Sequence, residues 1–217
     1  MARRQVFSVD QLLDGAQRAV ALHGREVTLQ QISEQCGAPM GSIYYRFASR
    51  DELLGELWLR AIGRWHQYLV RLIDDTPEPR AALLAVASAI PEYCRRFPDE
   101  AMAMTLWRQP DLATAGPASL RARAAVVNDH IYTRIMALAG EVVPEAEFEQ
   151  VVVVVMQLSY GLVRPLVGQA VPQWLDPVVL AAVDGALDVL TAGPKPGLPP
   201  VGTDRASVGG QDQGSST

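Results

Sequence analysis

Hydroxyl, aromatic and arginine side chains are concentrated in one short stretch, residues 37–54, which reads Gly-Ala-Pro-Met-Gly-Ser-Ile-Tyr-Tyr-Arg-Phe-Ala-Ser-Arg-Asp-Glu-Leu-Leu. Such side chains donate hydrogen bonds to phosphate oxygens, and a short helix can carry them to base edges in the major groove of DNA. Ile43 and Phe47 are four residues apart, so they share one helical face and predict its buried side. Ser42 and Tyr45 then point elsewhere, which predicts a DNA-contacting helix.

The residues before this helix predict how it is positioned. Thr28 and Gln31 have the spacing of a capping box, which predicts the start of a short helix over residues 28–35. Gly37 can supply the positive φ that a sharp turn between helices needs. A second short helix over residues 39–45 opens on a proline, which has no N–H to lose in a first turn.

Two longer helices should flank this pair. Ser8 and Gln11 predict a capping box at the start of a helix over residues 8–23. Ser49, with a glutamate three residues later, predicts a third capping box that starts a helix over residues 49–74. At about 1.5 Å per residue the latter is on the order of 39 Å long.

In this order, the features resemble the DNA-binding head of TetR-family transcriptional regulators, over roughly residues 8–56. The pattern Gly-x-x-x-Gly-Ser-Ile-Tyr-Tyr-Arg-Phe-x-Ser-Arg-Asp-Glu-Leu-Leu follows Thr-Leu-Gln-Gln-Ile-Ser in register. The resemblance implies an all-α chain with an N-terminal three-helix helix-turn-helix head, residues 1–48. A long helix would join this head to a helical effector-binding and dimerisation body, residues 49–191. Residues 192–217 have too little apolar content to pack, so we expect a disordered tail.

The resemblance also implies roles for individual residues of the head. Ser42 would reach the DNA, Tyr44 would contact a phosphate, and Tyr45 would face bases or sugar. Arg46 and Arg50 stand where family members often place a cation against the DNA backbone. The predicted DNA-contacting residues are Thr28, Met40, Ser42, Tyr44, Tyr45, Arg46 and Arg50.

Alternative interpretations remain open for several of these residues. Thr28 sits at a helix N-terminus, whose dipole favours a phosphate. Tyr44 could instead belong to the core, and Arg50 could simply neutralise a helix end. Arg3 and Arg4 precede the first helix, and they could form an arm on the DNA backbone or a solvated terminus.

The charge balance argues against DNA binding by bulk attraction. The 217 residues carry a net charge of −5, and residues 1–56 contain six arginines against seven acidic residues, a net −1. The head can still bind DNA if Arg3, Arg4, Arg46 and Arg50 cluster while its acids point away, and a dimer doubles that set. A small-molecule-binding or protein-interaction dimer with a non-functional DNA head is therefore the alternative function.

Beyond the long helix, helical patterns alternate with proline and glycine. The expected elements are a helix starting at Thr76 and Pro77 with a kink or break at Pro91, a segment restarting at Pro98, a loop over residues 109–117, a helix over 118–139 ending at Gly140, a helix over 144–169 bent at Gly161 and Pro165, and a last helix over 176–190.

The last two helices have the composition of an interface. Residues 151–156 are apolar all round a helical turn, which predicts burial on two sides. Small residues, Ala181, Ala182, Gly185 and Ala186, give the last helix a face that another helix can approach closely. The resemblance implies a homodimer with a two-fold four-helix interface, and ordinary monomer core is the alternative. Two-fold symmetry would place the recognition helices about 34 to 36 Å apart and predict a palindromic double-stranded DNA operator.

Aromatic and methionine side chains of the body suggest a pocket for a small apolar or aromatic effector. The predicted ligand-binding residues are Trp65, Trp107, Tyr160, Met102 and Met156. Aromatic residues at helical spacing more often belong to the core. Possible polar anchors are Asn128, His130, Gln157 and Arg164, each of which is more simply a surface or satisfied group.

Signals of other function classes are missing from the sequence. The three histidines lack the spacing of a metal site, and no nucleophile or phosphate-binding motif occurs, so we expect no enzyme, no metal and no cofactor. No apolar run approaches a membrane span, and no signal peptide precedes the first helix, so we expect a cytoplasmic chain with Cys36 and Cys94 as free thiols. The sequence predicts a ligand-responsive regulator, a repressor by family habit.

Overall fold

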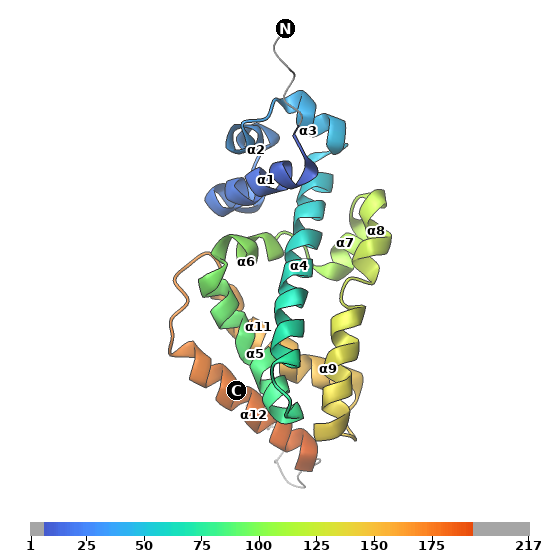
Figure 1. The fold of residues 1–217 in the computed structure, drawn as a ribbon, viewed down its shortest axis with the longest axis vertical. Helices are drawn as coiled ribbons and strands as arrows, with labels where there is room; N and C mark the ends of the chain where they lie inside the picture. Colours follow the sequence, from blue (N-terminus) through green and yellow to red (C-terminus); the bar gives the residue numbers. More distant parts are fainter. Residues whose placement is uncertain (1–6, 193–217) are drawn as a thin grey trace, which may run out of the picture.

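The computed structural model describes residues 7–192, and this part of the chain is helical without any strand. Figure 1 shows an elongated molecule with a small head at one end, formed by α1 to α3. The long helix α4 runs from the head down the length of the body. The predicted all-α fold with a helix-turn-helix head is confirmed.

The head is built as the sequence predicts. It consists of α1 (Val9–His23), α2 (Leu29–Cys36) and α3 (Met40–Arg46). Two of the three predicted capping boxes, Ser8 with Gln11 and Thr28 with Gln31, are formed in full. Gly37 ends α2 with a φ of 64°, which a residue with a side chain rarely adopts.

Helix α4 (Arg50–Asp74) begins at the predicted cap, with one change in its hydrogen bonds. The Ser49 hydroxyl accepts from the Glu52 amide at 3.0 Å, as a capping box requires. The Glu52 carboxylate accepts from the amide of Ala48 at 2.6 Å, one residue before the cap. The pair therefore fixes the turn between α3 and α4 as well as the start of α4.

The body contains shorter helices around α4. These are α5 (Pro79–Arg96), α6 (Pro98–Met104), α7 (Gln109–Ala115), α8 (Ala118–Ala125), α9 (Asp129–Val142), α10 (Phe148–Val152), a π-helical turn (Val153–Gln157), α11 (Leu158–Val163), a 3-10 turn (Arg164–Leu166) and α12 (Leu175–Ala192).

The loop predicted over residues 109–117 is wrong, because this segment forms α7. Pro110 occupies the first turn, where its missing N–H costs nothing. Leu112 is fully buried and holds the helix against its neighbours. The burial of Leu112 therefore favours a helix in a segment whose composition alone predicts a loop.

Two further boundaries differ from prediction around the next helices. The single helix over residues 118–139 is broken between α8 and α9, and α9 continues through Gly140 to Val142. Helix α5 starts at Pro79, capped by the Glu78 carboxylate, rather than at Thr76. It also runs through Pro91 without a break, because that ring is itself buried in the body.

The helix predicted from residue 144 starts later, at Phe148 in α10. Its irregularity also lies elsewhere, because the π-helical turn at Val153–Gln157 precedes Gly161. Pro165 lies in the 3-10 turn that ends α11. A π-helical turn inserts one extra residue, which hydrophobic periodicity does not reveal.

Apolar side chains form two cores, and α4 contributes to both. Residues 53–62 of α4 pack with the head and with α6 to α8, whereas Trp65, Leu69 and Ile73 pack with α5 and α9 to α12. The domain boundary at residues 48 and 49 stays a prediction, but the core of the head extends well into α4. No helix in residues 7–192 has the length and hydropathy to span a membrane.

Candidate nucleic-acid interface

Helix α3 has one buried face and one open face. Ile43 and Phe47 are 1% and 4% exposed and anchor α3 in the head core. Tyr44 and Tyr45 are 56% and 82% exposed. The alternative that Tyr44 is a core residue is therefore excluded in this structure. Two exposed phenol groups on a short second helix match the expected arrangement of a recognition helix.

The remaining α3 residues of the predicted set lie beside these tyrosines. The Arg46 guanidinium carbon lies 5.3 Å from the centre of the Tyr45 ring, a cation–π arrangement that presents both groups to solvent together. Ser42 and Met40 are half-buried. Met40 also packs against the head core, so only part of its side chain is available to DNA.

Thr28 lies at the exposed N-terminus of α2, and its hydroxyl already has protein partners. The oxygen accepts from the Gln31 amide at 3.2 Å and lies 3.1 Å from the Gln31 side-chain oxygen. A phosphate at this point would be bound by the free backbone amides of the first turn. The threonine hydroxyl would hold the helix start in place.

Arg50 is occupied within the protein. Its guanidinium donates to the carbonyl oxygens of Val27, at 2.5 Å, and of Arg25, and it lies 3.2 Å from an Asp51 carboxylate oxygen. These bonds tie the start of α4 to the segment between α1 and α2. A positioning role is therefore better supported for Arg50 than a contact with the DNA backbone.

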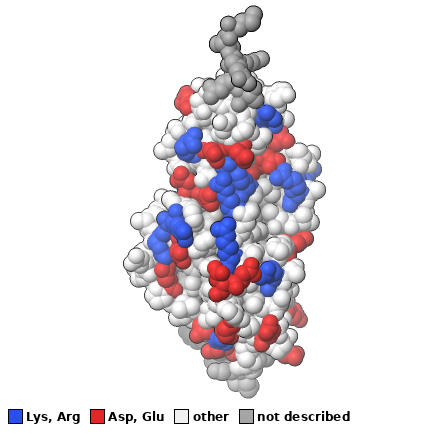
Figure 2. All heavy atoms as spheres, viewed as in Figure 1, with Lys and Arg blue, Asp and Glu red and all other residues white. Residues whose placement is uncertain are grey.

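The surface of the head is not uniformly basic. In Figure 2 basic and acidic side chains are mixed on the visible face. Arg18 donates to the Gln35 carbonyl oxygen at 2.9 Å and so braces α1 against α2. Arg3 and Arg4, the proposed arm, lie outside the described residues. Among the described arginines of the head, Arg46 is the one that lies on the open face of α3.

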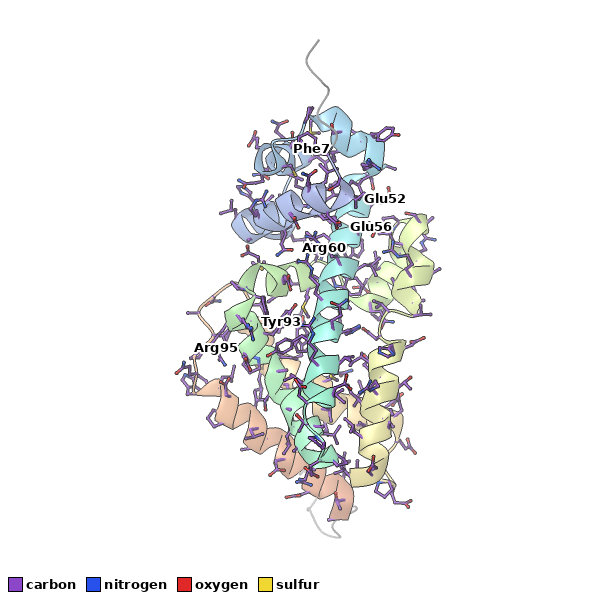
Figure 3. The ribbon with its side chains drawn as sticks, in the orientation of Figure 1. Phe7, Glu52, Glu56, Arg60, Tyr93 and Arg95 are labelled. Atoms are coloured by element: carbon purple, nitrogen blue, oxygen red, sulfur yellow. The ribbon has the colours of Figure 1, made fainter. Side chains whose placement is uncertain are left out.

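The first turns of α4, next to the recognition helix, are fastened to α8 (Figure 3). The Ser119 hydroxyl donates to Glu52 at 2.5 Å, and the Arg123 guanidinium binds Glu56 at 2.5 and 3.0 Å. Leu120 packs directly on Gly55, where a Cβ atom would collide with it. On the other side, Arg60 of α4 binds Asp14 of α1 at 2.7 Å.

The predicted ligand-binding residues fall in two hydrophobic clusters. Trp65, Met156 and Tyr160 belong to the body core, whereas Met102 and Trp107 pack on the core shared with the head. Trp65 lies 4.9 Å from the Tyr93 ring, centre to centre, within an aromatic cluster that leaves it 4% exposed. A ligand site shared by these five residues stays a prediction.

Sequence reasoning missed a hollow between α4 and α9. It has a volume of about 400 Å³ and contains none of the five predicted residues. Its lining residues are Gly63, His66, Gln67, Val70, Arg71 and His130. The sequence indicates this hollow only through the polar side chains His66, Gln67 and Arg71 on α4. It does not indicate that His130, more than 50 residues later, lies opposite them.

Comparison with known proteins agrees with this geometry. Residues 12–57, which span the capped helices, the turn and the start of α4, match the family model described as bacterial regulatory proteins, tetR family. The match covers the head and the first turns of α4 and does not extend into the rest of the body. The head is thus similar to the helix-turn-helix DNA-binding head of this family of transcriptional regulators. A search of curated proteins finds no match.

Solved structures of transcriptional regulators share the fold over most of this chain. A transcriptional regulator from Rhodococcus sp. Rha1 is 18% identical, with a TM-score of 0.70, over 87% of this chain and 100% of its own. The TetR family regulator PfmR from Thermus thermophilus is 18% identical, with a TM-score of 0.64, over 82% and 97%. FadR from Bacillus subtilis, solved in complex with stearoyl-CoA, is 16% identical, with a TM-score of 0.57, over 87% and 100%.

Proposed function

We propose that this chain is a homodimeric repressor of the tetR family that binds a palindromic operator and is released by a small-molecule effector. The observation that carries the proposal is the open face of α3, where Tyr44, Tyr45 and Arg46 project from a helix anchored by Ile43 and Phe47. Phosphate contacts from such groups position a helix, and contacts to base edges specify sequence. The chain would act as a regulator and not as an enzyme.

Exposed apolar side chains support the homodimer. In the single chain Val153 is 50% exposed. The prediction that residues 151–156 are buried on two sides is therefore wrong for the single chain, and this face needs a partner to cover it. On α12, Val178 and Val189 are exposed beside the small residues Ala181 and Gly185. The π-helical turn and α11 pack against α12, so these groups belong to adjoining elements. A second copy would cover them.

Helix α4 supports the effector response. Its N-terminal half is bound to α1, α6 and α8, and its C-terminal half lies in the body core. An effector that binds one orientation of α4 more tightly would shift the population of head positions. Two heads moved away from a spacing of about 34 to 36 Å would no longer fit successive major grooves. FadR of Bacillus subtilis, solved with stearoyl-CoA, is consistent with a small-molecule effector.

The proposal is tested with DNA from the region around the coding gene, searched for an inverted repeat. Fluorescence anisotropy should show specific binding that falls with added salt. Tyr45→Ala should weaken binding by about 1–3 kcal/mol if the ring reaches a base. Arg46→Ala should weaken it on all sequences and lower the salt slope by about 1 for each phosphate that the guanidinium neutralises. Arg164→Ala, an exposed arginine far from α3, is the matched control.

The alternative is a ligand-binding dimer whose head no longer binds DNA. The near-neutral head and the internal bonds of Arg50 are the observations that favour it. The same titration separates the two functions. Binding that is weak, independent of sequence and unchanged by Tyr45→Ala and Arg46→Ala would support the alternative.

A further inference from the structure

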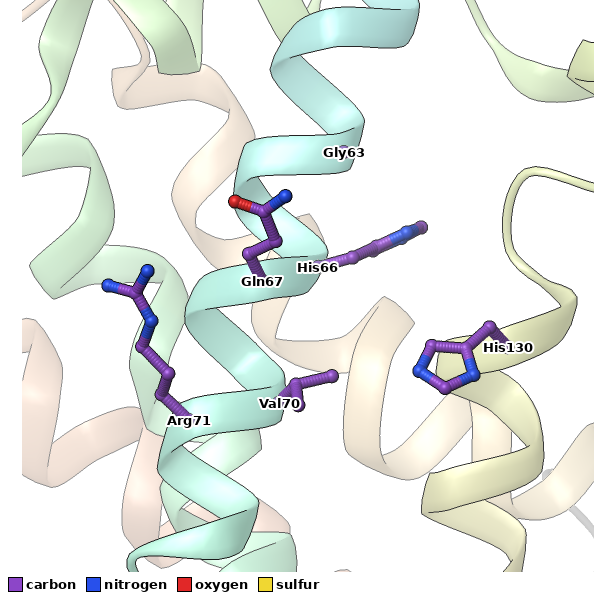
Figure 4. Close-up of a pocket in the computed structure, with 6 residues that line it drawn as sticks. All are labelled: Gly63, His66, Gln67, Val70, Arg71 and His130. Carbon is purple, nitrogen blue, oxygen red and sulfur yellow. The ribbon is translucent and has the colours of Figure 1, made fainter.

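The hollow between α4 and α9 is lined by five residues of α4 and by His130 of α9. Gly63 and Val70 are its apolar residues and are half-buried, whereas Gln67, Arg71 and His130 are exposed. In Figure 4 the His66 side chain extends toward α9, and His130 lies opposite it on that helix. Gln67 and Arg71 extend from α4 to the other side in this view. The volume of about 400 Å³ lies in the range of small-molecule sites, about 300–1,000 Å³.

Arg71 differs from the other arginines of α4. Arg50, Arg60 and Arg64 each bind a carboxylate, those of Asp51, Asp14 and Glu100. Within residues 7–192, the Arg71 guanidinium has neither an ion pair nor a side-chain hydrogen bond.

Asp74, one turn after Arg71, does not neutralise it. Its carboxylate is bound by Arg134 of α9, which ties the two helices together at this level. The hollow therefore has an exposed positive charge at one side, and although Asp75 lies four residues after Arg71, no ion pair between them forms within the described residues.

Two other polar groups of the hollow, those of Gln67 and His66, can form hydrogen bonds without carrying a charge at neutral pH. Gln67 lies four residues before Arg71, so its amide and the guanidinium are neighbours on one helical face. Burial, and then the nearby His130, lower the pKa of His66 to about 4, so its imidazole is neutral at neutral pH. A neutral ring beside Val70 can cover an apolar group.

We propose that this hollow binds a small organic carboxylate with an apolar body. The carboxylate lies at Arg71 and Gln67, and the apolar part crosses Val70 toward the two imidazoles. A guanidinium favours a planar carboxylate because it can donate two parallel hydrogen bonds. This assignment rests on the proposed function, for which it names the chemical class of the effector.

Binding at this site would act on the helix that leads to the heads. A ligand between α4 and α9 contacts both, and α8, which precedes α9, is fastened to Glu52 and Glu56 near the start of α4. The ligand would thus favour one arrangement of α4 relative to α8 and α9.

The test is calorimetric titration of the full-length protein, free of DNA, with octanoate and 4-phenylbutyrate. Octan-1-ol and octylamine carry similar apolar parts without the negative charge and serve as ligand controls. We expect the carboxylates to bind and Arg71→Gln to weaken binding at least tenfold, which corresponds to about 1.4 kcal/mol. Arg164→Gln makes the same change at an exposed arginine elsewhere and should leave binding unchanged.

Several outcomes would overturn the assignment. These are no heat of binding with either carboxylate at millimolar concentration, equal binding of octan-1-ol, and an Arg71→Gln variant that binds as tightly as the unmodified chain. The fourth is that the hollow is a metal site instead. In that case Zn²⁺ binds to the unmodified protein but not to the His66→Gln and His130→Gln variants, and neither carboxylate binds. Circular dichroism of each variant establishes that it is folded.

The result is separable from that of the DNA experiment. Operator binding without carboxylate binding would overturn this site and leave the regulator intact. Carboxylate binding that depends on Arg71 but does not change operator affinity would keep the site and refute its role as the effector site.

Discussion

At the scale of single residues, Gly15 marks the closest approach of two helices in the head. A Cβ atom at this position would collide with the Cys36 side chain and lie 2.8 Å from the Cys36 Cα atom. The Cys36 thiol donates to the Leu12 carbonyl oxygen at 3.4 Å, so the two helices are also joined there. The spacing of α1 and α2, and with it the angle of α3, depends on this absent side chain.

We predict that Gly15→Ala destabilises the protein by about 1–3 kcal/mol, because the head core would be overpacked. Urea unfolding followed by circular dichroism measures the change. Gly140→Ala is the matched control, since an added methyl there meets no atom within 4 Å. In the interior of α9 that change should stabilise the chain by up to about 1 kcal/mol. Equal effects of the two variants would contradict the packing argument.

His66 predicts a pH dependence of stability. Its folded pKa of about 4 lies below the ordinary value of 6.5, because burial and then His130 disfavour the charged ring. Between these values the unfolded chain binds more protons, so stability should fall as the pH is lowered from about 6.5 to 4. The loss attributable to this group is at most about 3 kcal/mol.

Thermal unfolding at a series of pH values tests this expectation. His66→Gln should remove part of the acid-side decrease, whereas His23→Gln, at an exposed helix end, should not. An unchanged profile for His66→Gln would show that the ring is not responsible.

The residue scale also shows what sequence could and could not specify at the site. The i to i+4 spacing of Ile43 and Phe47 was sufficient to predict the buried face of α3, and hence the exposure of Tyr45. The bonds of Arg50 to Val27 and Arg25 were not predictable, because they join positions more than 20 residues apart. The histidine pair of the hollow escaped prediction for the same reason.

At the scale of elements, local signals predicted the capped starts of α1, α2 and α4 well, and the starts and interruptions of the body helices poorly. Capping boxes at Ser8 and Thr28 involve residues three apart, so sequence contains all of their chemistry. The break between α8 and α9 and the π-helical turn depend on tertiary packing. The α7 helix forms because Leu112 finds a buried position, which composition does not indicate.

Leu120 is the main anchor of α8 on α4, since it is 1% exposed and lies against Gly55. We predict that Leu120→Ala costs about 2–5 kcal/mol of unfolding free energy, through reduced burial and the cavity left behind. Leu22→Ala, at a leucine exposed on α1, should change stability by less than about 0.5 kcal/mol. Chemical denaturation of both variants measures the difference, and a small cost for Leu120→Ala would mean that α8 is held by its ion pairs instead.

At the scale of the whole molecule, the exposed apolar residues of α12 predict the oligomeric state. Val178→Arg places a charge in the proposed interface and should convert the dimer to a monomer, because a buried unpaired charge costs several kcal/mol. Leu22→Arg makes the same change on the head and should leave the dimer intact. Light scattering coupled to size-exclusion chromatography measures the mass, and an unmodified chain that is monomeric at every concentration would refute the homodimer.

Because α4 belongs to both hydrophobic cores, the head is not a detachable module. A chimeric regulator that joins this head to another body after residue 48 would leave behind Leu53, Leu57 and the other α4 side chains that fill the head core. A workable graft would keep α4 through Ile62 and place its junction in the next turn, where the helix passes from one core to the other. It would also need a receiving body with an apolar side chain that packs on Gly55, as Leu120 of α8 does here, and a carbonyl group for Trp58, which here donates to Met104 at 3.1 Å. Specificity for DNA can therefore be exchanged among such proteins only together with the first half of the connecting helix.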